Sequence, residues 1–197
     1  MLILFSMVQG LPWSIYSTFV IEEKYGFNKT TKWTFVSDKI KGFLIGNVMI
    51  ALILPLILWI IQKAGPNLVI YLAGTSIALI VVLSLLVPNV IMPLFYSFSD
   101  LEEGKLSKAI YQESEKTSIL DSQIKVIDGS TRSSHSNAFV SGFGSFRKVV
   151  IFDTLIEQQT HDEIIAVVNH ELGHVHHSHI IKNVFMSAVT LTVMFFF

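Results

Sequence analysis

Five of the chain's seven histidines fall between Val167 and His179, in the stretch VVNHELGHVHHSH. His170 and His174 are four residues apart, so on a helix their rings would lie one turn apart on the same face. Two imidazoles placed in this way can bind one zinc ion, with metal–nitrogen distances of about 2.0–2.1 Å. The spacing therefore predicts His170 and His174 as metal ligands and Zn²⁺ as the cofactor.

Glu171 follows the first of these histidines directly, which would put its carboxylate beside the metal. There it could take a proton from a metal-bound water and deliver it to a leaving amine. Zinc lowers the pKa of such a water to about 7, so hydroxide would be available near neutral pH. The pattern predicts metal-assisted peptide hydrolysis, with Glu171 as the catalytic residue.

A helix must hold these side chains in place, and the sequence marks its start. Thr160 and Glu163 have the spacing of a capping box, which predicts a helix that begins at His161. Apolar residues continue the helical pattern towards the histidines: Ile164, Ile165, Val167, Val168 and Leu172.

Two histidines do not complete a catalytic zinc site, which takes three protein ligands and a water. The metzincin spacing would require a histidine at position 180, which is Ile180. A glutamate from a later helix is the other common solution, yet residues 175–197 contain no Asp or Glu. Residues 183–197 are also too few to cross a bilayer, which takes about 20 residues. We therefore expect a fragment whose missing C-terminal part holds the third ligand.

The remaining histidines of the stretch, His176, His177 and His179, allow more than one interpretation. A polar collar at a membrane interface is the simplest one. A histidine-rich loop of a metal transporter is an alternative from another functional class.

The composition predicts a membrane protein. Only 15% of the residues are charged, against about 25% in a typical soluble domain. Gly42 to Ile61 and Ala64 to Ser99 carry no charge at all. Each run is long enough to span a bilayer, and a chain of this size cannot bury two helices that are apolar on every side.

Charge and pattern divide the chain into segments. If the two uncharged runs span, twelve of the fourteen Lys and Arg residues share one side, which the positive-inside rule assigns to the cytosol. The absence of cysteine excludes disulfides and Cys-ligated zinc, and a net charge of −1 gives no sign of nucleic-acid binding. The predicted segments are a partial apolar segment at 1–21 interrupted by Pro12, a polar loop at 22–41, a helical hairpin at 42–99 turned at Gln62 to Asn67, an α+β domain at 100–179, and the start of a truncated transmembrane helix at 180–197.

Within 100–179 the pattern mixes helix and strand. Leu101 to Ile119 carries apolar residues among charges, as a surface helix does. QIKVID, SNAFVSGFG and RKVVIFD each indicate a short strand.

Six stretches follow one another along the chain from about Leu11 to Asn183: LPWSIYSTFVIEEKYGFNKTT, IMPLFYSF, LEEGKL, RSSHSNAF, VIFDTLIEQ and HELGHVHHSHIIKN. Together they resemble one known family, the zinc-dependent type I CAAX prenyl endopeptidases. A bacterial membrane quality-control protease with the same zinc motif is the alternative relative, and IEEKYGFN favours the prenyl protease.

The resemblance implies a multi-pass α-helical membrane protein of the endoplasmic reticulum, and also of the inner nuclear membrane, with a small gluzincin-like α+β zinc domain facing the cytosol. It implies removal of the last three residues from a prenylated C-terminal Cys-a-a-X, so the expected partners are prenylated proteins and membrane lipid. By motif match, His170 and His174 would be zinc ligands and Glu171 the base. The third ligand would be a downstream glutamate outside this chain. A non-catalytic scaffold or pseudoenzyme with the same fold is the competing hypothesis.

The stretch SNAF matches the family strand that lies along the active-site cleft. An exposed strand edge can hydrogen-bond an extended substrate, so Asn137 and Ala138 are expected to bind substrate, with Asn137 also a candidate contact of the reacting carbonyl. An ordinary hairpin strand is the alternative. His135 is expected either to line the cleft or to serve in a turn. His179 matches a histidine common in the family, with at most a hydrogen bond to a metal ligand.

Overall fold

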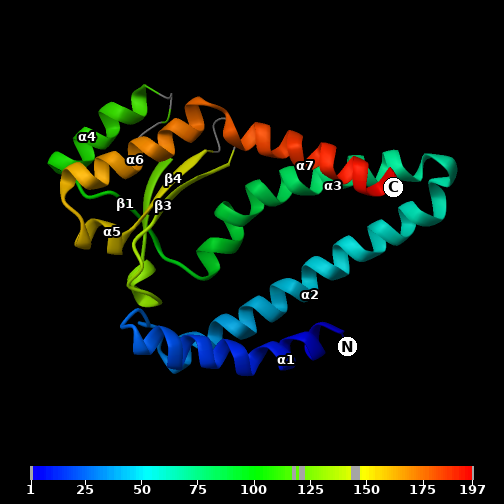
Figure 1. Ribbon diagram of the computed structural model, residues 1–197, viewed down its shortest axis with the longest axis horizontal. Helices are drawn as coiled ribbons and strands as arrows, with labels where there is room; N and C mark the ends of the chain where they lie inside the picture. The colour runs from blue at the N-terminus through cyan, green and yellow to red at the C-terminus, as the bar shows by residue number, and fades with distance from the viewer. Residues whose placement is uncertain (1, 117–118, 120–122, 143–146, 197) are drawn as a thin grey trace. The chain divides into compact units, whose positions relative to one another are not determined.

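Figure 1 shows the computed structural model of the chain, which describes residues 2–116, 119, 123–142 and 147–196. The chain forms two compact units. The first comprises residues 1–65 and 129–135, and the second comprises residues 66–128 and 136–197.

The first unit is built on two long helices that diverge from the connection between them (Figure 1). Helix α1 (Leu2–Tyr16) continues directly into the π-helical turn η1 (Ser17–Glu22). Helix α2 (Lys32–Lys63) begins where the Thr31 hydroxyl accepts a hydrogen bond of 3.0 Å from the Thr34 N–H, an N-cap.

Two features of this unit differ from the prediction. Pro12 does not interrupt α1. Proline removes only one internal hydrogen bond, and in apolar surroundings the other backbone groups have no water to bond instead, so the helix continues. Helix α2 begins at Lys32 rather than near Gly42. Residues 22–24 are still helical, so only residues 25–31 of the polar segment 22–41 form a loop.

The segment 129–135 belongs to the first unit, although it follows strand β2 in the sequence. It opens with the turn η6 (Gly129–Thr131). The Arg132 guanidinium donates two hydrogen bonds to the Asp38 carboxylate, at 2.8 and 3.0 Å. A β-bridge between Asn28 and Ser133 adds a backbone connection.

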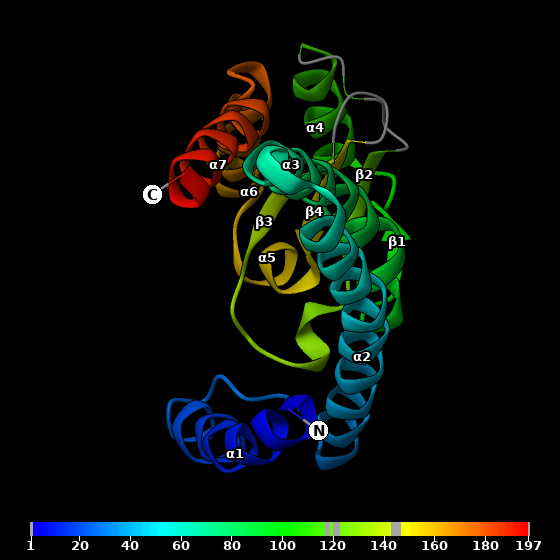
Figure 2. The ribbon, with the colours of Figure 1, turned by 90° about the vertical axis from the view of Figure 1, so that its right-hand side faces the viewer.

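In the second unit, α3 (Leu68–Leu86) leads through η3 (Val87–Ile91) and η4 (Met92–Leu94) to the sheet. Helix α7 (His179–Phe196) packs along α3, and Figure 2 shows the two side by side. Along the chain, the short turn η2 (Gly65–Asn67) lies where the hairpin turn was predicted. Among the described residues, three stretches are long and apolar enough to cross a bilayer: Leu4–Glu22, Lys32–Lys63 and Gly65–Leu94.

The sheet has four strands in the order β1-β2-β4-β3. Strands β2 and β4 are parallel, and the outer pairs β1–β2 and β3–β4 are antiparallel. Strands β2, β3 and β4 were predicted, whereas the three-residue β1 was not, because so short a segment shows no alternation. The strands are β1 (Phe98–Asp100), β2 (Ile124–Ile127), β3 (Ala138–Ser141) and β4 (Lys148–Phe152).

Three helices accompany the sheet: α4 (Lys105–Glu115), α5 (Asp153–Gln158) and α6 (His161–His176). Helix α4 packs against α6, and α6 packs against β3. The predicted surface helix at 101–119 is therefore present but shorter. Residues 117–118 of that segment, and residues 143–144 of the predicted strand segment SNAFVSGFG, lie outside the described residues. The combination of apolar helices with a small α+β domain confirms the predicted fold class. Its core includes the fully buried Ile110, Ile124, Val149, Ile151, Ile164 and Val168.

Candidate metal centre

Helix α6 begins with the predicted capping box. The Glu163 carboxylate accepts hydrogen bonds from the backbone N–H of Thr160 at 2.8 Å and from its hydroxyl at 2.7 Å. These two bonds favour the ionised form and hold the pKa of Glu163 below its ordinary value. The sequence thus fixes where the helix starts.

The apolar stripe of α6 sets the rotation of the helix about its axis. Ile164, Val168 and Leu172 are buried in the core, and each such side chain contributes roughly 1.5–3 kcal/mol to folding. His170 is exposed and His174 is half-buried, so burial of the apolar stripe turns the two imidazoles towards an accessible face.

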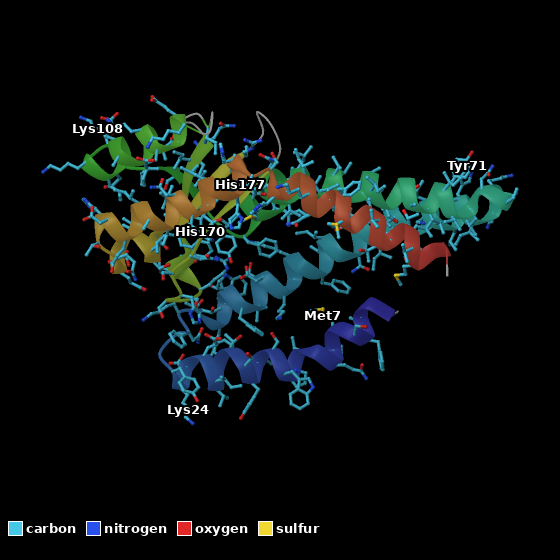
Figure 3. The ribbon with its side chains drawn as sticks, turned by 45° about the horizontal axis from the view of Figure 1, so that its top comes forward. Met7, Lys24, Tyr71, Lys108, His170 and His177 are labelled. Atoms are coloured by element: carbon cyan, nitrogen blue, oxygen red, sulfur yellow. The ribbon has the colours of Figure 1, made fainter. Side chains whose placement is uncertain are left out.

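The structure brings His170, His174 and Glu171 together. The Nε2 atoms of the two histidines are 3.2 Å apart, and the candidate ligand atoms of all three residues lie within 4.8 Å of one another. Two nitrogens bound to one tetrahedral zinc at about 2.05 Å would be roughly 3.3 Å apart. The imidazole pair therefore fits a single zinc-sized ion. Figure 3 shows His170 on α6 and His177 at the end of that helix.

The three remaining histidines of the stretch do not behave alike. His176 and His177 are exposed, with ring centroids 5.2 Å apart. His179 is half-buried, and its Nδ1 lies 2.6 Å from Nδ1 of His174. Loss of hydration lowers the pKa of His179, and the neighbouring charges of His174, Lys182 and His177 lower it further. No spacing of residues in the sequence predicts this contact.

The predicted substrate strand is the edge strand β3 and packs against α6. The Phe152 N–H donates to the Asn137 carbonyl at 3.0 Å, so the backbone of Asn137 faces β4. Because antiparallel pairing alternates, the N–H and C=O groups of Ala138 and Val140 face away from β4. The outward N–H of Ala138 donates to Asn137 Oδ1 at 2.9 Å.

His135 lies in the other compact unit. Its ring stacks on Phe27 with a centroid distance of 4.1 Å, and its Nε2 is 3.4 Å from the Glu22 carboxylate. These contacts fit the turn role that was the alternative to cleft lining. The structure does not place His135 in the unit that holds α6 and β3.

Apolar helices that lead into a small sheet domain with a His-Glu-x-x-His helix define a multi-pass membrane metalloprotease fold. Two family models match the chain. "CAAX prenyl protease N-terminal, five membrane helices" matches residues 1–97, and "Peptidase family M48" matches residues 100–197. The chain belongs to the CAAX prenyl protease branch of peptidase family M48. Membership implies a metal cofactor.

Individual relatives agree with this assignment. "CAAX prenyl protease 1 homolog" of Oryza sativa subsp. japonica is 46% identical over 172 residues, which cover 87% of this chain and 40% of the relative. The Homo sapiens protein of the same name is 34% identical in an alignment 230 residues long, gaps included, which covers 98% of this chain and 48% of the relative. The crystal structure of S. mikatae Ste24p is similar with a TM-score of 0.91 and 39% identity, over 97% of this chain and 46% of that chain. The chain thus spans somewhat less than half the length of these relatives.

Proposed function

We propose that the protein is a membrane zinc metalloendopeptidase that removes the C-terminal tripeptide from prenylated Cys-a-a-X proteins. The observation that carries the proposal is the 3.2 Å separation of the Nε2 atoms of His170 and His174, with Glu171 beside them. The substrate class comes from the relatives, which are named CAAX prenyl proteases.

His170 and His174 would hold the zinc through their Nε2 atoms. The third ligand expected from the family resemblance is a downstream glutamate outside this chain. When bound, zinc lowers the pKa of a coordinated water and polarises the scissile carbonyl.

Glu171 performs the proton transfers. Its carboxylate accepts a proton from the attacking water and then donates that proton to the nitrogen of the leaving tripeptide. Its half-buried position next to the two imidazoles leaves it accessible from the face where they converge.

The open edge of β3 would bind the substrate as an added strand. Val140 presents its backbone N–H and C=O there, and Ala138 presents its C=O, since the Ala138 N–H donates to Asn137 Oδ1. A flexible prenylated tail can pair with these groups in extended form. The side-chain Nδ2 of Asn137 makes no hydrogen bond within the described residues, so it can donate to the reacting carbonyl. The substrate role of His135 stays a prediction.

The active site would face the cytosol from the endoplasmic reticulum membrane, and from the inner nuclear membrane, with lipid around the apolar helices. Support comes from the distribution of Lys and Arg. The uncharged runs Gly42 to Ile61 and Ala64 to Ser99 separate Lys63, the one basic residue at the hairpin tip, from most of the others. Protease protection of sealed microsomes would test this orientation.

The decisive experiment replaces Glu171 in the native protein. Glu171→Gln should lower the rate of tripeptide release from a farnesylated peptide by about 10²- to 10⁴-fold, with the zinc content unchanged. Glu157→Gln, a change of an exposed carboxylate on α5, is the matched control and should leave the rate as it was. If Glu171→Gln cleaves like the control, the protein is a scaffold rather than a peptidase of this mechanism.

A further inference from the structure

The chain breaks its helix immediately after the metal-binding turn. Helix α6 ends at His176, and Ser178 adopts φ = 53°, the one non-glycine residue with positive φ among those that the structure describes. This left-handed conformation is sterically unfavourable for an L-residue. Hydrogen bonds hold the turn: the His177 N–H donates to the Gly173 carbonyl at 3.0 Å, and the Ser178 N–H donates to the Val175 carbonyl at 2.9 Å.

The break has a direct effect on where His179 lies. In an uninterrupted helix, residues 174 and 179 would be separated by about 140° around the axis, on different faces. After the turn at Ser178, the two rings instead have centroids 4.8 Å apart and Nδ1 atoms 2.6 Å apart. The contact therefore depends on the left-handed turn.

Cation binding through Nε2 would determine which nitrogen of His174 carries the proton. The Nε2 atom of His174 faces Nε2 of His170. A neutral imidazole has one N–H and one lone pair, so Nε2 can bind a cation only when the proton is on Nδ1. In that tautomer the Nδ1–H of His174 would donate to Nδ1 of His179, 2.6 Å away.

We propose that His179 is a positioning residue of the metal centre. It accepts a hydrogen bond from the Nδ1–H of His174, holds that ring in the tautomer whose Nε2 binds the ion, and fixes its orientation. His176 and His177 make no such contact with His174 or His170 in the described structure, so a polar collar accounts for them but not for His179. The proposal rests on the metal site of the proposed function.

Three substitutions at His179 separate this role from simple packing. Asn places an amide oxygen close to the position of Nδ1, Phe keeps the ring without an acceptor, and Gln moves the acceptor farther from the backbone. A positioning role predicts that His179→Asn binds zinc nearly as the unaltered protein does, whereas His179→Phe and His179→Gln bind about 10- to 100-fold more weakly. A packing role predicts the reverse for Asn and Phe.

The measurement is the zinc dissociation constant of the native protein in detergent, by competition with a chromophoric chelator. His176→Phe is the matched control, because its ring contact is with His177, and it should not change the constant. If His179→Phe does not fold, the Asn and Gln variants still decide. Unaltered zinc affinity in the Phe or Gln variant would overturn the inference while leaving the proposed function intact. Absence of zinc binding in the unaltered protein would instead overturn the proposed function.

Discussion

Replacing one peptide N–H of the substrate by N–CH₃ removes a single backbone donor and leaves the protease unaltered. If the substrate pairs with the open edge of β3, only amides opposite the outward groups of Ala138 and Val140 donate to the enzyme. Amides between them point the other way, because strand pairing alternates with a period of two residues. Sensitivity to methylation should therefore appear at amides two residues apart and be small at the amide between them.

The size of the effect follows from one lost hydrogen bond. A backbone hydrogen bond contributes about 0.5–1.5 kcal/mol net, which corresponds to a loss of about 2- to 12-fold in kcat/KM at each sensitive amide. The short described strand β3, Ala138–Ser141, has two residues with outward groups, so two sensitive amides are expected.

The assay is the release of the C-terminal tripeptide from a set of farnesylated peptides that differ only in the position of the N-methyl group. On the enzyme side, Val140→Pro removes an outward N–H and should lower kcat/KM by the same factor. Phe139→Pro is the contrast, because the Phe139 N–H faces β4 and its loss should lower the thermal midpoint as well. Equal sensitivity at consecutive amides, or no sensitivity at all, would refute pairing with the edge of β3.

Three further substitutions test the supporting structure. Thr160→Ala removes the hydroxyl that donates to the Glu163 carboxylate, and it should lower the free energy of unfolding at neutral pH. The backbone N–H of Thr160, which the substitution leaves in place, and this hydroxyl both lower the pKa of Glu163. The contribution of the hydroxyl should therefore be full above pH 4.5, the ordinary value, and be lost as the pH falls through the lowered pKa. Denaturant titrations at several pH values should show the difference between the two proteins shrink in acid; a difference that is constant at every pH would contradict this prediction. Arg132→Lys should lower the free energy of unfolding by about 1 kcal/mol, because an ammonium cannot make both hydrogen bonds to the partly buried Asp38. The same change should speed hydrogen exchange in residues 129–135. Unchanged exchange would argue against a role of this ion pair in holding the segment. Ser178→Val should weaken zinc binding because a β-branched residue is strained at positive φ, whereas Ser178→Gly should not, and chelator competition on both variants decides.

Local signals in the sequence predicted the helix that carries the metal site. The capping box of Thr160 and Glu163 marked its first residue, and the apolar spacing marked the stripe that includes Ile164 and Val168. These features act within one or two turns of chain. A sequence displays such local patterns directly, so the approach of His170 and His174 followed from their spacing.

Other features depend on contacts that no local pattern encodes. The left-handed turn occurs at Ser178 rather than at a glycine, the residue that usually signals such a turn in a sequence. The contact of His179 with His174 could therefore not be derived from spacing. The sequence predicted that Pro12 interrupts a helix, yet α1 continues through it. Proline ends a helix most readily where water can hydrogen-bond the backbone groups that lose their partners. The ion pair of Arg132 with Asp38 joins residues far apart in the chain, and only the folded structure brings them together.

The path of residues 129–135 has a practical consequence for dissecting the protein. The two family models divide the chain between residues 97 and 100, yet this segment leaves the peptidase part after β2, packs with Asp38 and Asn28 of the helical part, and returns as β3. A clone that begins at that border would lack Asn28 and Asp38, the partners of the segment that leads directly into β3. The peptidase part expressed alone would therefore lose the contacts that hold residues 129–135 in place.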